Sequence, residues 1–180
     1  NLFKAEKEVY GNLTSGGTES IFLSLLSARE WSLKNRSISN PEVILSTTAH
    51  PAFLKAMKFL KIKPVIIPAT NSFNLDIDKF SSAINDNTIL LVGSAPAYPY
   101  GMIDPISHLS EIAIKNNLLL HVDACIGGFL LSYLKKLDYN VPSFDFSLEG
   151  VTSISVDLHK YAYAPKGSSV LLYKNAELKK

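Results

Sequence analysis

Short apolar runs alternate with amphipathic stretches along this chain, and this alternation constrains the fold more than any other feature. Runs with the length and composition of buried strands lie at 42–46, 63–68, 88–94, 118–124, 151–157 and 168–174. Helical patterns lie at 18–34, 51–61, 76–84, 104–116 and 127–137. Apolar strands separated by helices favour a mostly parallel sheet with helices on both faces. We therefore predict one three-layer α/β/α domain with a sheet of six or seven strands.

Residues at the helix ends support these boundaries. Pro51 stands at a favoured first helical position, Asp76 lies near a positive helix N-terminus, and Asp104 is expected to cap the helix at 104–116. The opening NLFKAEKEVYG is typical of the tail of a helix. We therefore expect the sequence to be an excerpt from a longer protein.

Composition excludes several classes of protein. The 180 residues are 47% hydrophobic, which indicates a well-buried globular domain. A net charge of +2, from 18 basic and 16 acidic residues, gives no argument for binding nucleic acid or an anionic membrane. No apolar run approaches the length of a bilayer span. The single cysteine excludes an internal disulfide framework and fits a reducing compartment, so we expect a cytoplasmic location unless a segment outside this stretch anchors the protein.

The ends of the predicted strands carry the residues of chemical interest, because ligands of such folds bind beyond the carboxyl ends of the strands. The segment TSGGTES (14–20) opens the first long helix, where Gly17 allows a close backbone approach and Thr18 adds a hydroxyl. Free N–H groups at a helix start favour an anion such as phosphate. An ordinary helix-capping turn has the same composition, so this segment alone does not establish a phosphate site.

Aromatic side chains follow two other strands. His50 lies after the strand at 42–46, and Tyr98 and Tyr100 lie in a proline-rich loop after the strand at 88–94. A histidine at such an edge is more often structural than catalytic, although its imidazole can stack on a planar ring. Loop tyrosines are usually packing residues.

An acidic residue and a lysine stand at the two remaining strand ends. Asp123 ends a strongly apolar strand, where a carboxylate is costly unless it is paired, and Cys125 follows it. Asp123 is either a structural cap or ion-pair partner, or a carboxylate directed at a cationic ligand group. Lys160 lies just past the strand at 151–157, and Lys166 follows six residues later. Either lysine could be an ordinary solvated side chain.

One cofactor uses all of these elements together. Pyridoxal phosphate needs a lysine for covalent attachment, a carboxylate for its ring nitrogen, a group that stacks on the ring and a helix N-terminus for its phosphate. Each element is weak evidence alone, whereas their joint order at successive strand ends favours pyridoxal phosphate. We assign no metal ligands.

Several motifs resemble those of the sphingosine-1-phosphate lyase family, within the decarboxylase-like group of fold-type I pyridoxal-phosphate enzymes. They are TSGGTESI, AHPAF, GSAPAYPYG, HVDACIGGF and HKYAYAPKGSS, which together span nearly the whole chain. The resemblance implies that Lys160 forms the Schiff base, Asp123 pairs with the pyridine nitrogen and His50 stacks on the ring. It further implies that Gly17 and Thr18 hold the cofactor phosphate with the help of His159. We also count Cys125 among the cofactor-binding residues, because a small residue after Asp123 leaves space beside the ligand.

The same resemblance implies a substrate and an assembly. Tyr98 and Lys166 match positions near the substrate, so that the implied catalytic set is Lys160, Lys166, Tyr98 and His50. The implied reaction cleaves the C2–C3 bond of a phosphorylated sphingoid base, in a homodimer with the active site at the subunit interface. Residues 1–180 correspond to an incomplete large, cofactor-binding domain. An amino-acid decarboxylase of the same fold and a truncated, non-catalytic fragment remain the alternatives.

Overall fold

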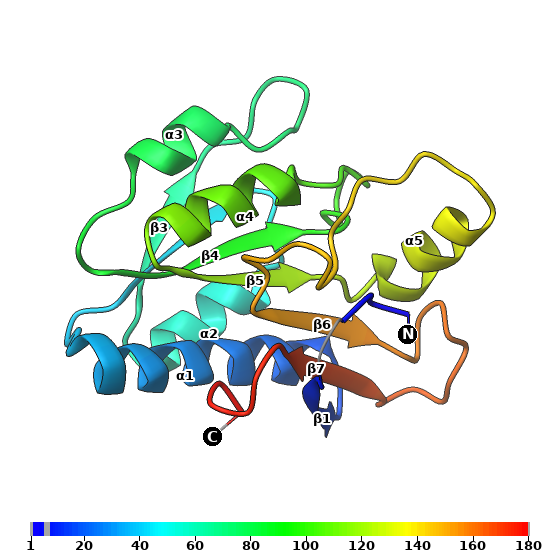
Figure 1. The fold of residues 1–180 in the computed structure, drawn as a ribbon, viewed down its shortest axis with the longest axis horizontal. Helices are drawn as coiled ribbons and strands as arrows, with labels where there is room; N and C mark the ends of the chain where they lie inside the picture. The colour runs from blue at the N-terminus through cyan, green and yellow to red at the C-terminus, as the bar shows by residue number, and fades with distance from the viewer. Residues whose placement is uncertain (1, 6–7, 180) are drawn as a thin grey trace.

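The computed structural model describes residues 2–5 and 8–179, and it forms one sheet flanked by helices (Figure 1). The strands are β1 (Tyr10–Thr14), β2 (Glu42–Ser46), β3 (Lys63–Ile67), β4 (Thr88–Ser94), β5 (Leu119–Asp123), β6 (Ser153–Asp157) and β7 (Ser169–Tyr173). The helices are α1 (Gly17–Arg36), α2 (Ala52–Leu60), α3 (Ile77–Ser82), α4 (Ile106–Lys115) and α5 (Gly127–Lys136). The strands and helices predicted between residues 18 and 174 are all present, with ends that agree within two residues.

The seven strands follow the order β1-β7-β6-β5-β4-β2-β3. Neighbouring strands from β3 to β6 are parallel, whereas β7 runs antiparallel to β6, and β1 runs antiparallel to β7. The mostly parallel, seven-stranded sheet is therefore confirmed. Because β2, β5 and β6 are parallel, their carboxyl ends lie at one edge of the sheet.

Helices cover both faces of the sheet and produce two cores (Figure 1). On one face, Phe53 and Met57 of α2 pack with α1 residues against the sheet. On the other face, Phe80 of α3 and Leu109 of α4 pack with residues of α5. The predicted three-layer arrangement is confirmed. None of the helices in the described ranges has both the length and the apolar character needed to span a membrane.

The N-terminal segment differs from the sequence prediction. Residues 2–5 and 8–9 are not helical, and the chain then enters β1, which the sequence did not predict. Part of the predicted helix tail, at residues 1 and 6–7, lies outside the described residues. The sequence of β1, YGNLT, has only one large aliphatic residue, and this residue, Leu13, is 81% exposed. The segment therefore has no apolar pattern that would predict a strand. Its pairing with β7, from Tyr10 opposite Tyr173 to Thr14 opposite Ser169, specifies it as a strand.

The two predicted aspartate caps have different outcomes. Asp76 accepts a hydrogen bond from the backbone N–H of Lys79, as a cap does. Asp104 does not cap α4, which begins at Ile106. Its carboxylate instead accepts a hydrogen bond from the backbone N–H of Ser94, at 2.7 Å. Burial raises the pKa of Asp104 to about 6, even though the Ser94 hydrogen bond acts against that rise.

Candidate active site

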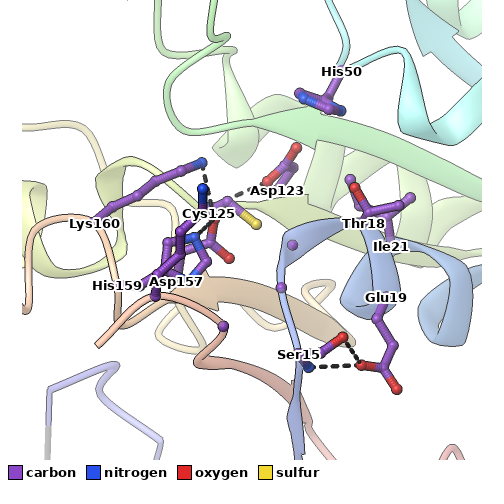
Figure 2. A pocket seen from close by; sticks show the side chains of 14 residues that line it. Ser15, Thr18, Glu19, Ile21, His50, Asp123, Cys125, Asp157, His159 and Lys160 are labelled. Atoms are coloured by element: carbon purple, nitrogen blue, oxygen red, sulfur yellow. Dashed lines mark hydrogen bonds and ion pairs between the residues drawn. The ribbon is translucent and has the colours of Figure 1, made fainter. Parts of the chain in front are cut away.

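A cavity of about 410 Å³ lies where the N-terminus of α1 meets the carboxyl ends of β2, β5 and β6 (Figure 2). Its lining residues are Ser15, Gly16, Gly17, Thr18, Glu19, Ile21, His50, Asp123, Cys125, Asp157, His159, Lys160, Lys166 and Gly167. The structure thus brings every predicted site residue except Tyr98 to one cavity. Asp157, which is not among the predicted site residues, also lines the cavity.

The turn before α1 provides a close backbone approach. The helix begins at Gly17 without a side-chain cap, and a Cβ atom added there would lie 2.8 Å from Sγ of Cys125 and 3.0 Å from Oδ1 of Asp157. Only glycine therefore fits this position without displacing its neighbours. Glu19 fastens the turn, because its carboxylate accepts hydrogen bonds from the backbone N–H and the hydroxyl of Ser15. These bonds lower the pKa of Glu19 and keep it ionised.

A buried hydrogen-bond chain holds Asp123 at the end of β5. Oδ1 of Asp123 accepts hydrogen bonds from the backbone N–H of Cys125, at 3.1 Å, and from the hydroxyl of Ser155, at 3.3 Å. The Ser155 hydroxyl lies 3.2 Å from Nε2 of His121, whose Nδ1 lies 2.9 Å from the hydroxyl of Ser153. Burial lowers the pKa of His121 to about 4, although the charge of Asp123 acts against this. The neutral imidazole of His121 therefore holds the Ser155 hydroxyl, which in turn donates its hydrogen bond to Asp123.

Cys125 is a buried thiol on the cavity wall, 6% exposed. Burial raises its pKa well above the ordinary value, and the charges of Asp123 and Asp157 raise it further. The thiol stays protonated at neutral pH, and it serves as a small wall residue rather than as a nucleophile.

Lys160 is paired with a carboxylate outside the predicted set of site residues. Its Nζ lies 2.9 Å from Oδ2 of Asp157, which is 3% exposed at the end of β6 (Figure 2). Nε2 of His159 lies 3.6 Å from the same oxygen, and the hydroxyl of Ser169 donates to the other oxygen, Oδ1. The order of the strands alone would place Lys160 opposite Asp123. The signal that could have identified Asp157 is its position at the end of a buried strand, three residues before the lysine.

His50 enters the cavity from the β2–α2 turn. Its Nδ1 accepts a hydrogen bond from the backbone N–H of Ala52 at 3.1 Å, which orients the ring and leaves the proton of the neutral imidazole on Nε2. The Tyr98 ring lies 5.1 Å from the His50 ring, between centroids, and Tyr98 is 51% exposed. Tyr98 therefore lies beside His50, outside the set of lining residues.

The loop between β6 and β7 places Lys166 on the cavity wall together with Gly167. The backbone N–H groups of Leu158 and His159 both donate to the carbonyl of Ser168, which ties the two ends of the loop together. Gly167 has a φ of +89°, a backbone conformation that other residues rarely adopt. The cavity therefore has two lysines, one held by a buried aspartate and one on an exposed loop.

These residues fit pyridoxal phosphate. The glycine turn offers backbone N–H groups at a helix start, where even a methyl group would collide with Cys125 and Asp157. A lysine amine, a fixed carboxylate and an oriented imidazole complete the set of groups that the cofactor requires.

Comparisons with known proteins define the class. The fold is that of fold-type I pyridoxal-phosphate enzymes: the chain superimposes on the structure of Burkholderia pseudomallei sphingosine-1-phosphate lyase with a TM-score of 0.94 and 44% sequence identity. The superposition covers 97% of this chain and 40% of that one. The sequence profile of the pyridoxal-dependent decarboxylase conserved domain matches residues 2–179. The chain therefore belongs to the pyridoxal-dependent decarboxylase family, whose cofactor is pyridoxal phosphate.

Several relatives within that family are sphingosine-1-phosphate lyases. The chain is 48% identical to sphingosine-1-phosphate lyase of Oryza sativa subsp. japonica over 173 residues, which is 96% of this chain and 32% of the relative. It also superimposes on Lactobacillus brevis glutamate decarboxylase with a TM-score of 0.86, over 99% of this chain and 43% of that one. At 23% identity, that second match shows the fold alone. The chain spans about a third of the length of the curated lyases that it matches.

Proposed function

We propose that the complete protein is a pyridoxal-phosphate-dependent carbon–carbon lyase. It cleaves the C2–C3 bond of a phosphorylated sphingoid base and releases a long-chain aldehyde and phosphoethanolamine. The observation that carries this proposal is the pair of lysines on one cavity wall, Lys160 and Lys166. The glycine turn serves the phosphate of the cofactor, so Lys166 is a second cation available for a phosphate on the substrate.

The positions of the side chains around the cavity support the following cofactor contacts. We assign Lys160 to covalent attachment, Asp123 to the ring nitrogen and His50 to one face of the ring. The start of α1 at Gly17 and Thr18 would bind the phosphate, with His159 beside it and Cys125 on the adjacent wall. When bound, pyridoxal phosphate supplies an electron sink for the pair released by the breaking carbon–carbon bond. Asp123, held in place by its buried hydrogen bonds, would pair its carboxylate with the ring nitrogen.

Substrate handling falls to residues at the opening of the cavity. Lys166 carries its charge on an exposed loop and is assigned to the substrate phosphate. Cleavage also requires a base for the proton of the 3-hydroxyl group, and Tyr98 and Lys166 are the candidates that this chain offers. The Tyr98 ring lies 5.1 Å from the ring of His50, which lines the cavity, and this contact supports the assignment of Tyr98.

The assembly and location of the complete protein are part of the same proposal. We propose that residues 1–180 form most of a large, cofactor-binding domain, and that two copies of the protein form a dimer with the active site at their interface. The similarity to lyases about three times as long supports the first point. The lone, buried thiol of Cys125 is compatible with a reducing, cytoplasmic compartment.

A lysine substitution distinguishes this function from decarboxylation of an amino acid. The complete protein with pyridoxal phosphate is incubated with a sphingoid phosphate, and the aldehyde released is measured. We expect Lys166→Ala to lower kcat/KM at least ~10-fold, because a charged hydrogen bond to the phosphate contributes roughly 1.5–3 kcal/mol. Affinity for the cofactor should stay unchanged. Lys115→Ala, at the end of α4, is the matched control and should behave as the unmodified protein does.

Two outcomes would contradict the proposal. Decarboxylation of a plain amino acid as efficient as cleavage of the sphingoid phosphate would favour the decarboxylase alternative, which the match to the pyridoxal-dependent decarboxylase domain makes the second candidate. A complete protein that neither binds pyridoxal phosphate nor releases any product would favour the non-catalytic alternative.

A further inference from the structure

Asp157 is a buried carboxylate to which the proposed reaction assigns no role. It is 3% exposed and lies at the end of β6, with Oδ1 accepting from the hydroxyl of Ser169 on β7. Its other oxygen, Oδ2, faces Nζ of Lys160 at 2.9 Å and Nε2 of His159 at 3.6 Å. A buried carboxylate held by a neighbouring strand, with its free oxygen directed at a lysine, has the geometry of a counter-ion.

The surroundings of the pair define its electrostatics. Asp123 at the end of β5 and Cys125 in the β5–α5 connection both face the pair, and the backbone of Gly17 closes the side next to α1. Burial of the Lys160 ammonium opposes its charge, but the hydrogen bond and the charge of Asp157 outweigh that burial, so the pKa of Lys160 is raised. Cys125 is a neutral thiol at neutral pH, and Asp157 is therefore the main cause of the increase.

This pairing affects the chemistry expected of Lys160. A neutral amine adds its lone pair to an aldehyde carbon, the carbonyl oxygen takes up protons, and loss of water leaves a carbon–nitrogen double bond. An ammonium has no lone pair and cannot begin this reaction. A proton must therefore leave Lys160 first, and a neighbouring anion makes that loss harder.

We propose that Asp157 is a positioning residue that holds Lys160 as an unreactive ammonium at the end of β6 until an aldehyde ligand enters the cavity. Removing the charge of Asp157 should make Lys160 a faster nucleophile in the cofactor-free protein. The inference rests on the proposed function in one respect: Lys160 needs such control only if it attaches the cofactor covalently. Its test needs neither cofactor nor substrate, so a failed lyase assay leaves the result unaffected.

The test measures the reactivity of Lys160 directly. The cofactor-free complete protein is labelled with trace acetic anhydride between pH 7 and pH 11, and the acetylation of each lysine is followed by mass spectrometry. The Lys160 side chain is 36% exposed, so solvent screens the pair and its interaction is at the scale of a surface ion pair. We expect Asp157→Asn to increase the labelling rate of Lys160 at pH 8 about two- to fivefold.

Two controls accompany the variant. The rate at Lys166 in Asp157→Asn should match that of the unmodified protein, which shows that the cavity has not simply opened. Glu42→Gln removes the carboxylate of a comparable ion pair, to Lys63 at 2.8 Å, on β2 and β3 and outside the lining of the cavity. It should leave the rate at Lys160 unchanged.

The asparagine is suited to the test because its amide oxygen can still accept the hydrogen bond from Ser169. An unchanged or lower rate at Lys160 in a folded Asp157→Asn protein overturns the proposal. If the variant does not fold, the pH dependence of Lys160 labelling in the unmodified protein tests the proposal instead. A labelling midpoint for Lys160 above the ordinary lysine value of 10.5 supports the proposal, and a midpoint at or below that value overturns it.

Discussion

Replacing Asp104 by asparagine is expected to change how the stability of this fold depends on pH. The Asp104 side chain is buried beside β4, where Oδ2 accepts from the backbone N–H of Ser94 at 2.7 Å. Its other oxygen, Oδ1, has no hydrogen-bond partner within the described ranges. Burial raises the pKa of this carboxyl from the ordinary 3.8 to about 6. Asparagine keeps the acceptor for Ser94 and carries no charge at any pH.

The magnitude follows from the linkage between proton binding and folding. Between pH 3.8 and about 6 the folded chain binds the Asp104 proton more tightly than the unfolded chain does, so stability falls as pH rises through this range. At about 1.36 kcal/mol per pKa unit, the full loss is about 3 kcal/mol above pH 6. Asp104→Asn should therefore equal the unmodified protein below pH 4 and exceed its free energy of unfolding by about 3 kcal/mol at pH 8.

His121 gives a slope of the opposite sign. Its folded pKa of about 4 lies below the ordinary 6.5, so its contribution to stability is lost as pH falls from 6.5 towards 4. The contribution is present in both proteins and cancels when one is compared with the other. In Asp104→Asn, the His121 slope should appear without the opposing slope of Asp104.

Urea unfolding of the cofactor-free protein at a series of pH values provides the measurement. Asp86→Asn, at an exposed site, controls for the loss of a surface charge. A stability difference between Asp104→Asn and the unmodified protein that does not vary with pH would refute the reasoning, as would a variant that is less stable at pH 8.

Two further substitutions test the cavity itself. Gly17→Ala should weaken binding of pyridoxal phosphate at least ~10-fold, because the new methyl group would lie 2.8 Å from Sγ of Cys125. Gly16→Ala, where a Cβ meets no atom within 4 Å, is the control in the same turn, and equal affinities for the two variants would contradict the close approach. Ser155→Ala removes a donor to Asp123 and a partner of His121, and it should cost about 1–3 kcal/mol in the free energy of unfolding and weaken cofactor binding. Ser24→Ala is the control, because the Ser24 hydroxyl donates to the Ile21 carbonyl within α1. If Ser155→Ala loses no more unfolding free energy than Ser24→Ala, the hydrogen bonds that link His121, Ser155 and Asp123 contribute little to stability.

The sequence was sufficient to predict the sheet and most of the cavity, because both follow from the alternation of apolar strands with helices. Parallel strands end at one edge, so residues placed after β2, β5 and β6 had to approach one another. The positions of His50, Asp123 and Lys160 along the chain are therefore enough to predict that they share one site.

Other features depend on contacts that no local pattern reports. The strand β1 exists because β7 pairs with it, although its Leu13 faces solvent. The partner of Lys160 depends on the turn after β6, which brings the lysine back over Asp157 rather than towards Asp123. Asp104 has the sequence features of a cap, but the backbone of Ser94 binds its carboxylate before α4 begins.

The central claim is that this cavity binds pyridoxal phosphate through Lys160, and reduction of the bound cofactor tests it most directly. The complete protein is loaded with pyridoxal phosphate, reduced with borohydride and digested, and the peptides are mapped by mass spectrometry. We predict one phosphopyridoxyl group, on Lys160, which Lys160→Ala abolishes and Lys166→Ala leaves in place. A label on Lys166, or none on Lys160, would contradict the account.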